Sequence, residues 1–292
     1  MSPNSYSYKK LVSALKTIGL KKNDLVLVHS SLFALGAMED VSPKDLTVKC
    51  YEAIREVIGH KGTLLVPTVF EEYARFGKPY DCVLSPVDPL VGIFSSYVAR
   101  LKGSYRTYCP LLSLTGNGPL AKEICHSWTA SACGANSAWE KLYEYDAKIC
   151  YLGVRPSQAF TFLRFIQFRY GVPYIYNKIF TTPIYENKKL VSLSVICPVR
   201  YLNPQFKISE NSLPFEEHLT VKKLVRIQNL GKGKVYLLPS AQKVFDEGIK
   251  KLNKNLYYFL KEKPQFTPGK IPMDGKVGAY VKDELRFAQA AK

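Results

Sequence analysis

The sequence predicts an α/β fold: a central mixed, largely parallel sheet flanked by helices, with a smaller antiparallel β plus helix subdomain toward the C-terminus. Short apolar runs rich in β-branched residues, which are typical of buried strands, alternate with segments of helical spacing. A strand, a helix and a second strand follow one another over residues 24–69, and this order implies a right-handed βαβ unit with parallel strands. Alternating segments joined by short turns appear only in the last third.

The first elements are marked by their spacing and their end signals. Residues 8–18 place apolar side chains on one helical face, and Gly19 ends the helix. The apolar run 24–29 is too short for a helix and predicts a buried strand, which Ser30 and Ser31 end. Ser42 and the proline after it begin a second helix that reaches residue 58, and residues 62–69 form the next strand.

The middle of the chain combines regular segments with two irregular ones. Residues 70–89 contain acids, aromatics, glycine and prolines, and they predict a long loop of the kind that often binds ligands. A second loop is expected around residues 134–139. Between and after these loops we expect helices over 91–101, 120–127 and 160–170, and strands over 106–118 and 148–154.

The last third has a different pattern, which sets the predicted domain organisation. Two hairpins are expected, one pairing 180–185 with 189–199 and one pairing 221–230 with 234–238. A long amphipathic helix follows from residue 241 to about 261, and the polar tail after Pro264 is expected to be loosely held. The predicted segments are a core over 1–178, a hairpin and helix unit over 179–263, and a tail over 264–292.

Composition limits the class of protein. No apolar run approaches the roughly 20 residues that a membrane-spanning helix needs, and the first ten residues lack the apolar part of a secretory signal. Seven cysteines without a Cys-x-x-Cys pair indicate buried free thiols in a reducing compartment, so a cytoplasmic location is expected. The four histidines are not spaced as zinc ligands with these cysteines, so no metal is expected.

Net charge is the strongest compositional signal. The chain has 41 Lys plus Arg against 24 Asp plus Glu, a balance of +17, and the basic residues are scattered. No signature of a nucleic-acid-binding module is present, so nucleic acid is not expected as a partner. The charge favours an enzyme that attracts small phosphate-bearing molecules, although plain solubility accounts for the same balance.

The turn after the first strand is the first candidate site. Ser30 and Ser31 follow a buried strand directly, so backbone N–H groups are expected at its carboxyl end. Open α/β sheets bind ligands at this edge, and anionic ligands in particular. The alternative is an ordinary turn between a strand and a helix.

Several motifs occur in a fixed order along the chain. They are VHSSLFALG at 28–36, GTLLVPTVF at 62–70, Ser85-Pro86 with Gly92, Arg106 with Cys109-Pro110 and Ser113, Gly134 with Ser137 and Lys141-Leu142, LGV at 152–154, TFL at 161–163 and GVPY at 171–174. In this order they resemble the aminoglycoside 3-N-acetyltransferase family, whose members transfer an acyl group from acyl-CoA to an amine. The resemblance covers roughly residues 5–260 and implies the fold of that family and acyl-CoA as co-substrate.

The resemblance also implies a donor site in the 1–178 core. Backbone N–H groups of the VHSSL turn would hold the pantetheine or the thioester oxygen, and Ser113 would approach the thioester from the neighbouring strand end. The residues implied for acyl-CoA binding are Ser30, Ser31, Leu32, Phe33, Arg106, Ser113 and Thr161. The alternative for the serines is that they only cap strand ends.

The chain departs from the family pattern on the acceptor side. The family has His-x-x-Glu after TFL, where this chain has Arg164 and Gln167, and it has His where this chain has Cys109. Neither arginine nor glutamine accepts a proton. An amino-sugar amine is partly neutral near pH 7 and can attack a thioester directly, so a protein base is not required. The pattern resembles relatives that N-acylate nucleotide-linked amino sugars, as in anthrose biosynthesis.

The remaining candidates have structural alternatives. The acceptor site is predicted to use Glu72, Tyr73, Asp88, Arg164 and Gln167. Arg164 suits a diphosphate or a sugar oxygen, and its alternative is an ion pair with a nearby carboxylate. His29 and Cys109 are the weakest catalytic candidates, because a core histidine and a buried inert thiol explain them as well.

The predicted function is an acyl-CoA-dependent N-acyltransferase for the amine of a nucleotide-linked amino sugar, for example a dTDP-amino-dideoxyhexose of cell-surface polysaccharide synthesis. One alternative is an aminoglycoside 3-N-acetyltransferase. The other is a catalytically silent relative that binds CoA or a nucleotide. The acyl group, the sugar and the oligomeric state stay open.

Overall fold

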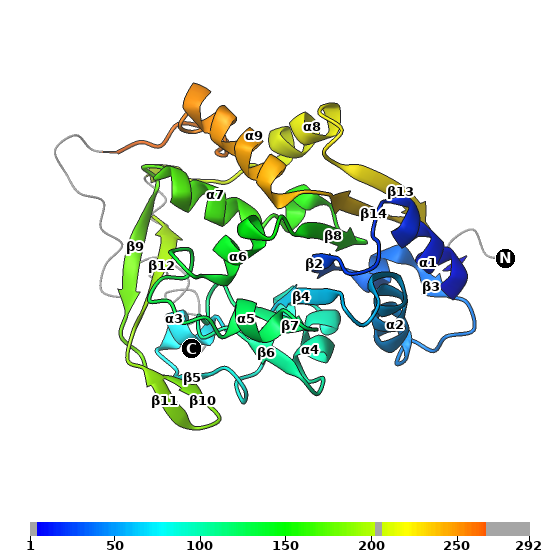
Figure 1. Ribbon diagram of the computed structural model, residues 1–292. Helices are drawn as coiled ribbons and strands as arrows, with labels where there is room; N and C mark the ends of the chain where they lie inside the picture. Colours follow the sequence, from blue (N-terminus) through cyan, green and yellow to red (C-terminus); the bar gives the residue numbers. More distant parts are fainter. Residues whose placement is uncertain (1–4, 202–205, 267–292) are drawn as a thin grey trace, which may run out of the picture.

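A seven-stranded mixed sheet forms the centre of the computed structural model, which describes residues 5–201 and 206–266 (Figure 1). The strand order is β13-β14-β8-β2-β4-β7-β6. The strands are β2 (Leu25–Ser30), β4 (Thr63–Pro67), β6 (Ser104–Arg106), β7 (Leu114–Asn117), β8 (Lys148–Leu152), β13 (Arg226–Leu230) and β14 (Gly233–Leu238). The predicted mixed α/β fold is confirmed. Its parallel part is limited to the three central strands β8, β2 and β4, and the outer pairs are antiparallel.

Helices cover both faces of this sheet. One face carries α1 (Tyr8–Thr17), α2 (Leu46–Ile58) and α4 (Ile93–Ala99). The other packs against α5 (Ala121–Cys125), α6 (Ala138–Glu144), α7 (Phe162–Tyr170), α8 (Leu213–Val221) and α9 (Ala241–Lys254). The short helices α3 (Glu72–Phe76), η1 (Leu32–Leu35), η2 (Pro89–Val91) and η3 (Pro156–Gln158) lie in the connections, the last three as 3₁₀ turns.

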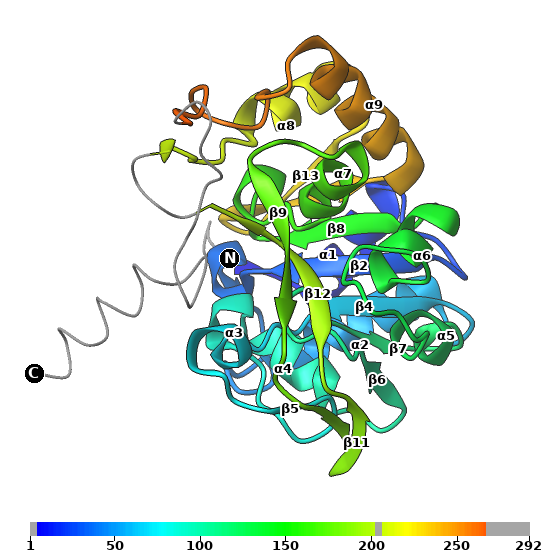
Figure 2. The same ribbon diagram turned by 90° about the vertical axis from the view of Figure 1, so that its left-hand side faces the viewer.

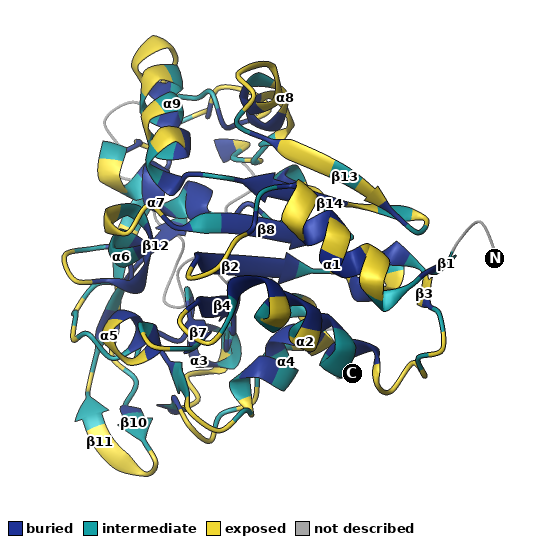
Figure 3. Cartoon of the chain, turned by 45° about the vertical axis from the view of Figure 1, so that its right-hand side comes forward, coloured by how far each residue is buried: buried dark blue, intermediate teal, exposed yellow. Residues whose placement is uncertain are grey.

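The alternation of side chains along the central strands explains the two layers. In β2, Val26 and Val28 belong to the apolar cluster under α1 and α2, whereas Leu25 and Leu27 belong to the cluster on the opposite face. Successive side chains of a strand point to opposite faces, so a continuous apolar run fits a strand that is covered on both sides. Figure 3 shows the buried central strands between helices whose outer faces are exposed.

Smaller sheets lie outside the central one. β9 (Ile175–Phe180) and β12 (Val195–Arg200) form an antiparallel pair, which we call the β-arm. The other small strands are β10 (Ile184–Glu186) and β11 (Lys189–Ser192), which form a hairpin beside β5 (Tyr80–Asp81), and β1 (Ser5–Tyr6), which pairs with β3 (Ala37–Met38). Figure 2 shows the β-arm crossing in front of β8, β2 and β4.

The β-arm and the segment that follows β9 are fixed to segments that follow β4 and β6. The hydroxyl of Tyr73 donates to the carbonyl of Thr182 at 2.7 Å, and the Sγ atoms of Cys109 and Cys197 lie 3.6 Å apart. The Tyr80 N–H donates to the carbonyl of Pro183 at 3.1 Å. The β-arm therefore lies over the carboxyl end of β4.

Several local predictions differ from the structure. The expected loop 70–89 contains α3, β5 and η2, and the second expected loop runs into α6. The strand expected over 106–118 is two strands, β6 and β7. The strand expected over 189–199 is divided into β11 and β12, and β12 pairs with β9 rather than with β10. Helix α8 lies in a segment for which no helix is predicted, and α9 ends at Lys254.

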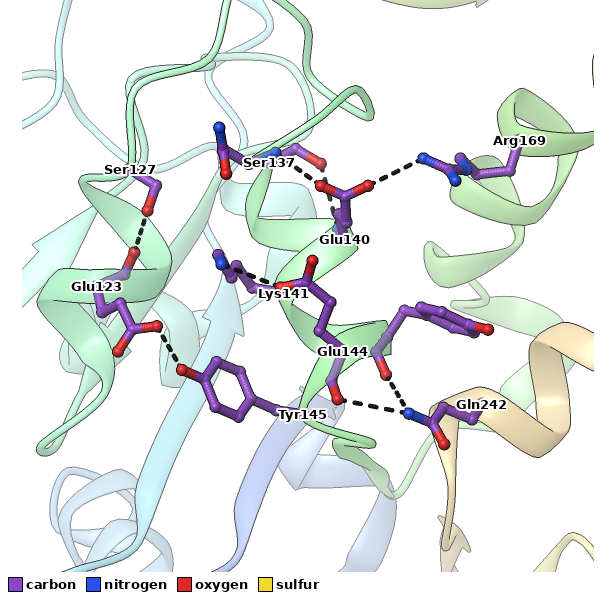
Figure 4. A network of polar contacts seen from close by, with 11 residues as sticks. Glu123, Ser127, Ser137, Glu140, Lys141, Glu144, Tyr145, Arg169 and Gln242 are labelled. Carbon is purple, nitrogen blue, oxygen red and sulfur yellow. Dashed lines mark hydrogen bonds and ion pairs between the residues drawn. The ribbon is translucent and has the colours of Figure 1, made fainter.

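Polar contacts hold α6 to its neighbours (Figure 4). The Ser137 side chain accepts from the Glu140 N–H at 3.2 Å and so caps the helix. The Glu140 carboxylate pairs with Arg169 of α7 at 2.9 Å. The Gln242 side chain of α9 donates to the carbonyl of Tyr143 at 3.1 Å, which joins the two helices at the C-terminal end of α6.

The division of the chain at residue 178 stays a prediction. The hairpin of β13 and β14 extends the central sheet through β8, so part of the second predicted unit completes the sheet of the first. Most of the predicted tail, residues 267–292, lies outside the described residues. Among the helices that the structure describes, none is long and apolar enough to cross a membrane.

Candidate functional site at the carboxyl edge of the central strands

The turn after β2 lies at the carboxyl edge of the parallel strands. Ser30 pairs with Leu152 of β8, and the Ser31 N–H donates to the Leu152 carbonyl at 2.8 Å. The Ser31 N–H, one of the donors predicted for acyl-CoA, is therefore already bonded within the sheet. Leu32 and Phe33 open η1, and the first N–H groups of a helix have no partner within it. Leu32 is buried, whereas the Phe33 side chain is exposed.

Two glycine backbones hold this turn from both sides. A Cβ atom on Gly153, whose φ is +70°, would lie 2.4 Å from the carbonyl oxygen of Ser31. A Cβ atom on Gly92, at φ +86°, would lie 3.2 Å from the carbonyl oxygen of Ser30. Both glycines belong to the motifs that mark the sequence. Their missing side chains let the loops after β8 and before α4 approach the VHSSL turn closely.

His29 is a buried residue at the same edge. Its Nε2 atom lies 3.2 Å from Oγ1 of Thr161, and its ring stacks on that of Tyr151 with centroids 5.1 Å apart. Burial lowers the pKa of His29 to about 3, so the imidazole is neutral near pH 7. The contact brings Thr161, at the start of α7, to the end of β2. These contacts favour a core histidine over a general base.

Arg164 and Gln167 share one carboxylate. Arg164 Nη2 lies 2.9 Å from Oε1 of Glu210, and Gln167 Nε2 donates to the same oxygen at 3.3 Å. Arg200 Nη1 lies 3.6 Å from Oε2 of Glu210. The alternative reading of Arg164, an ion pair with a nearby carboxylate, is therefore present in the structure.

The charge state of Glu210 follows from this arrangement. Burial alone would raise the pKa of the carboxyl, but the guanidinium groups of Arg164 and Arg200 outweigh it, so the pKa lies below its ordinary value. Two buried polar atoms of the cluster, Arg164 Nη1 and Gln167 Oε1, have no hydrogen-bond partner among the described residues. Buried polar atoms are normally satisfied, so these two atoms are the donor and the acceptor of the Glu210 cluster that lack a partner among the described residues.

Arg106 and Ser113 lie beneath the surface and already have partners. Arg106 donates to the carbonyls of Thr68 and Pro86, and its Nη1 donates to the carbonyl of Ser85 at 2.7 Å. Ser113 shares hydrogen bonds with Thr68 at 3.1 Å and Thr107 at 3.2 Å. These bonds join the loop before β7 to the end of β4. They favour a structural role, and acyl-CoA binding by the two residues stays a prediction.

Cys109 faces another thiol rather than a base. Its Sγ atom lies 3.6 Å from that of Cys197, and both side chains are buried. Cys109 therefore links the loop after β6 to the β-arm. This position fits the alternative of an inert core thiol.

The three predicted residues of the 70–89 segment have local partners. Glu72 pairs with Lys78 at 2.9 Å, and Asp88 caps η2 by accepting from the Leu90 N–H at 2.9 Å. Tyr73 is buried, and its hydroxyl donates to the carbonyl of Thr182, in the segment between β9 and β10. Their part in acceptor binding stays a prediction that these contacts do not favour.

The sequence does not predict Glu210 or Arg200 as site residues. Glu210 is the single acidic residue between Glu186 and Glu216, which is a weak signal that sequence alone does not connect to Arg164. Among the described parts of the chain, no group of three or more His, Cys, Asp and Glu side chains is arranged to hold a metal ion.

Comparison with known proteins gives relatives of one kind. The family model described as aminoglycoside 3-N-acetyltransferase matches residues 27–253. Aminoglycoside N(3)-acetyltransferase IV from Salmonella sp is 29% identical over 172 residues, which are 58% of this chain and 62% of that protein. Aminoglycoside N(3)-acetyltransferase III from Serratia marcescens is 24% identical over 175 residues, 54% of this chain and 63% of that protein. The chain thus spans less than two thirds of these curated relatives.

Solved structures share the fold over a larger part of the chain. Aminoglycoside acetyltransferase AAC(3)-IIb superposes with a TM-score of 0.72 at 19% identity, covering 89% of this chain and 100% of that one. AAC-IIIb in a binary complex with CoASH gives 0.72 at 18% identity, covering 89% and 100%. AAC-VIa bound to sisomicin gives 0.72 at 18% identity, covering 86% and 98%. With the family model matching more than three quarters of its residues, the chain belongs to the aminoglycoside 3-N-acetyltransferase family.

Proposed function

We propose that the protein is an acyl-CoA-dependent N-acyltransferase that acylates an amine of an amino sugar. The observation that carries the proposal is the VHSSL turn at the carboxyl edge of β2, joined to the start of α7 through His29 and Thr161, in a chain of this family. The donor would be a CoA thioester. One solved relative is a complex with CoASH.

The proposed donor site consists of the residues around this turn. Leu32 and Phe33 would present backbone N–H groups to the thioester oxygen, and Ser30, Ser31 and Thr161 would line the pantetheine. Backbone N–H groups placed at a developing oxyanion lower the barrier because they need no reorganisation during the reaction. No metal takes part in the proposed reaction.

The proposed chemistry does not use a protein base. The neutral amine attacks the thioester carbonyl carbon, the C–N bond forms, and the C–S bond breaks. The departing CoA thiolate takes the proton that the amine loses. Arg164 and Gln167 cannot accept this proton, and a histidine with a pKa of about 3, as His29 has, is a poor acceptor at pH 7.

Two kinds of acceptor are compatible with this chemistry. Related structures are complexes with sisomicin, a gentamicin and apramycin, which favours an aminoglycoside. The net charge of +17 and the guanidinium groups at Glu210 favour an acceptor with fewer positive charges, such as a nucleotide-linked amino sugar. The family comparison supports the aminoglycoside more directly, and the charge of this chain supports the nucleotide-linked sugar.

Thiol release from acetyl-CoA tests the proposal. The purified protein is mixed with acetyl-CoA and either sisomicin, apramycin or a dTDP-linked amino sugar, and free CoA is followed with a thiol reagent. Amine-dependent release is expected with at least one acceptor, and the ratio of kcat/KM values identifies the class. CoA binding without release for any amine would contradict the enzyme and favour a silent binding protein.

A further inference from the structure

We infer that Cys109 and Cys197 form an oxidisable dithiol, a modification site at which hydrogen peroxide closes a disulfide between the loop after β6 and the β-arm. The two Sγ atoms lie 3.6 Å apart, and both side chains are buried. Within the part of the chain that the structure describes, no other two cysteines lie within hydrogen-bond distance of each other. The inference does not depend on acyl transfer, since a disulfide needs only the two thiols and an oxidant.

The two sulfur atoms need only a small movement to form a bond. A disulfide has an S–S distance of about 2.05 Å, so the sulfurs have to approach each other by about 1.5 Å. Cys197 lies in the middle of β12, where the ladder with β9 holds its backbone. Cys109 lies in the connection between β6 and β7, outside any helix or strand. The movement is therefore expected in the segment of Cys109.

The surroundings of the pair make Cys109 the thiol that reacts first. The hydrogen bond from the Cys197 thiol lowers the pKa of Cys109 in spite of burial, and backbone N–H groups of Leu111 and Leu112 act in the same direction. The bond to Cys109 and burial raise the pKa of Cys197, which therefore keeps its proton. Burial raises the pKa of the other five cysteines as well. Because the thiolate is the form that peroxides oxidise, the reaction is expected to select Cys109.

A small cavity gives the oxidant a place beside Cys109. Its volume is about 20 Å³, and Thr107, Cys109 and Cys125 belong to its lining. A single water needs roughly 10–15 Å³, so the cavity admits a molecule little larger than water, such as hydrogen peroxide. Ser127 and Thr129 of the lining are half-buried, which places the cavity close to the surface.

The proposed reaction has two steps. The Cys109 thiolate attacks one oxygen of hydrogen peroxide, the O–O bond breaks, and the products are a sulfenic acid on Cys109 and one water. The Cys197 sulfur then attacks the Cys109 sulfur, the S–O bond breaks, and a second water leaves with the proton of the Cys197 thiol. In total, two thiols lose two electrons and two protons, and one peroxide is reduced to two waters. A small thiol such as glutathione reverses the reaction by thiol–disulfide exchange.

The disulfide would join parts of the molecule that are 88 residues apart in the sequence. The β-arm crosses in front of the central strands (Figure 2). A bond from Cys197 to the loop after β6 would fix the β-arm in this position. Closing a long loop restricts the unfolded chain, so the oxidised protein is expected to unfold at a higher temperature.

Peptide mapping of the native protein tests the inference. The reduced protein, freed of reductant, is treated with hydrogen peroxide, alkylated with N-ethylmaleimide in urea and analysed by mass spectrometry. We expect the loss of two thiols, a mass lower by about 2 Da, and linked peptides that contain Cys109 and Cys197. Dithiothreitol should restore all seven thiols. An unchanged number of thiols would overturn the inference.

Two other cysteines serve as controls in the same experiment. Cys125 lines the cavity beside Cys109 and has no thiol partner, so it should stay reduced. Equal oxidation of Cys125 would show that access to the cavity, and not the thiol pair, decides the reaction. Cys133 interacts electrostatically with both thiols of the pair, and its segment bonds to β12 through Ala132 at 2.8 Å. A disulfide that contains Cys133 would overturn the assigned pair.

A variant without the second thiol separates the two steps. In Cys197→Ser, Cys109 should stop at the sulfenic acid, which dimedone traps, and no disulfide should form. The midpoint of thermal unfolding should rise by several degrees on oxidation of the native protein, fall back with dithiothreitol, and show no rise in Cys197→Ser. A disulfide of Cys109 in this variant, or an unchanged midpoint in the oxidised native protein, would contradict a bond that fixes the β-arm.

Discussion

Arg164 is the main difference between the acceptor side of this protein and the family pattern, which has a histidine at this position. A histidine at this position would alternate between charged and neutral forms, but a guanidinium keeps its charge at every accessible pH. Arg164 holds Glu210 as a carboxylate together with Arg200. The residue therefore contributes charge and geometry rather than proton transfer.

A double-mutant cycle measures the interaction of Arg164 with Glu210. Both side chains are largely buried, so the pair Arg164→Gln and Glu210→Gln is expected to show a coupling of about 1–3 kcal/mol in the free energy of unfolding. Urea denaturation of the two single variants and the double variant gives this value. The exposed pair Lys49 and Glu52 is the control, and no measurable coupling is expected there. Additive effects at Arg164 and Glu210 would contradict the ion pair.

His29 makes stability depend on pH in a defined direction. Its folded pKa of about 3 lies below the ordinary value of 6.5, so between these values the unfolded chain takes up a proton that the folded chain excludes. The free energy of unfolding should therefore fall as the pH falls below 6.5, by on the order of 2 kcal/mol at pH 5 from this group.

Urea unfolding at pH 7 and pH 5 checks the histidine prediction. His29→Gln should lose this part of the pH dependence, and the exposed His60→Gln should keep it. Equal pH dependence in the native protein and His29→Gln would show that His29 takes up its proton in the folded state as well.

At the scale of elements, the close approach of the loop after β8 to the turn after β2 is the feature most sensitive to substitution. Gly153→Ala would place a Cβ atom 2.4 Å from a backbone oxygen, whereas Gly77→Ala, at a similar φ of +63°, meets no atom within 4 Å. In both variants the positive φ lowers the free energy of unfolding by about 1 kcal/mol, because a residue with a Cβ atom disfavours this conformation.

The difference in thermal stability between the two glycine variants measures the cost of the contact between the new Cβ atom at position 153 and the carbonyl oxygen of Ser31. Gly153→Ala is expected to lower the midpoint of thermal unfolding clearly more than Gly77→Ala and to raise KM for acyl-CoA. Differential scanning fluorimetry and the thiol assay measure the two effects. Equal unfolding midpoints for the two variants would mean that the loop after β8 and the turn after β2 can move apart without loss of stability.

Elements with a distinct apolar pattern could be predicted from the sequence, whatever their length. The continuous apolar runs of β2, β4 and β8 mark buried strands, and the apolar spacing of α1 and α7 marks helices. Helix α6 has seven residues and follows Asn136, which has a positive φ, so its start resembles a loop. Proline at the second position and weak amphipathicity hide α8 in the same way.

The candidate site could be predicted only where it is continuous in the sequence. The VHSSL turn and the start of α7 carry their own motifs, so the resemblance assigns both to the site. The contact between His29 and Thr161 is seen only in the structure. Glu210 is 43 residues from Gln167, and nothing in its local sequence indicates this partner. Contacts of this range are set by the path of the β-arm, which local periodicity does not reveal.

At the scale of the whole molecule, the net charge of +17 should act on the donor from a distance. Acyl-CoA carries several negative charges, so long-range attraction is expected to raise its association rate at low ionic strength. KM for acetyl-CoA should therefore rise severalfold between about 10 mM and 500 mM NaCl, as the Debye length shortens. Acetyl-pantetheine, which has no phosphate, is the control and should show little salt dependence. The same salt effect for both donors would point to a general loss of activity.

The order of the strands in the central sheet has a consequence for synthesis of the chain. β8 lies between β2 and β14, and its pairing with β14 joins Leu152 to Val235. A nascent chain on the ribosome therefore carries β8 with one edge of unpaired backbone N–H and C=O groups until more than 80 further residues have been translated. During that interval the unpaired edge of β8 is open to pairing with a strand of another chain, so this stage of synthesis is expected to be the one most exposed to aggregation.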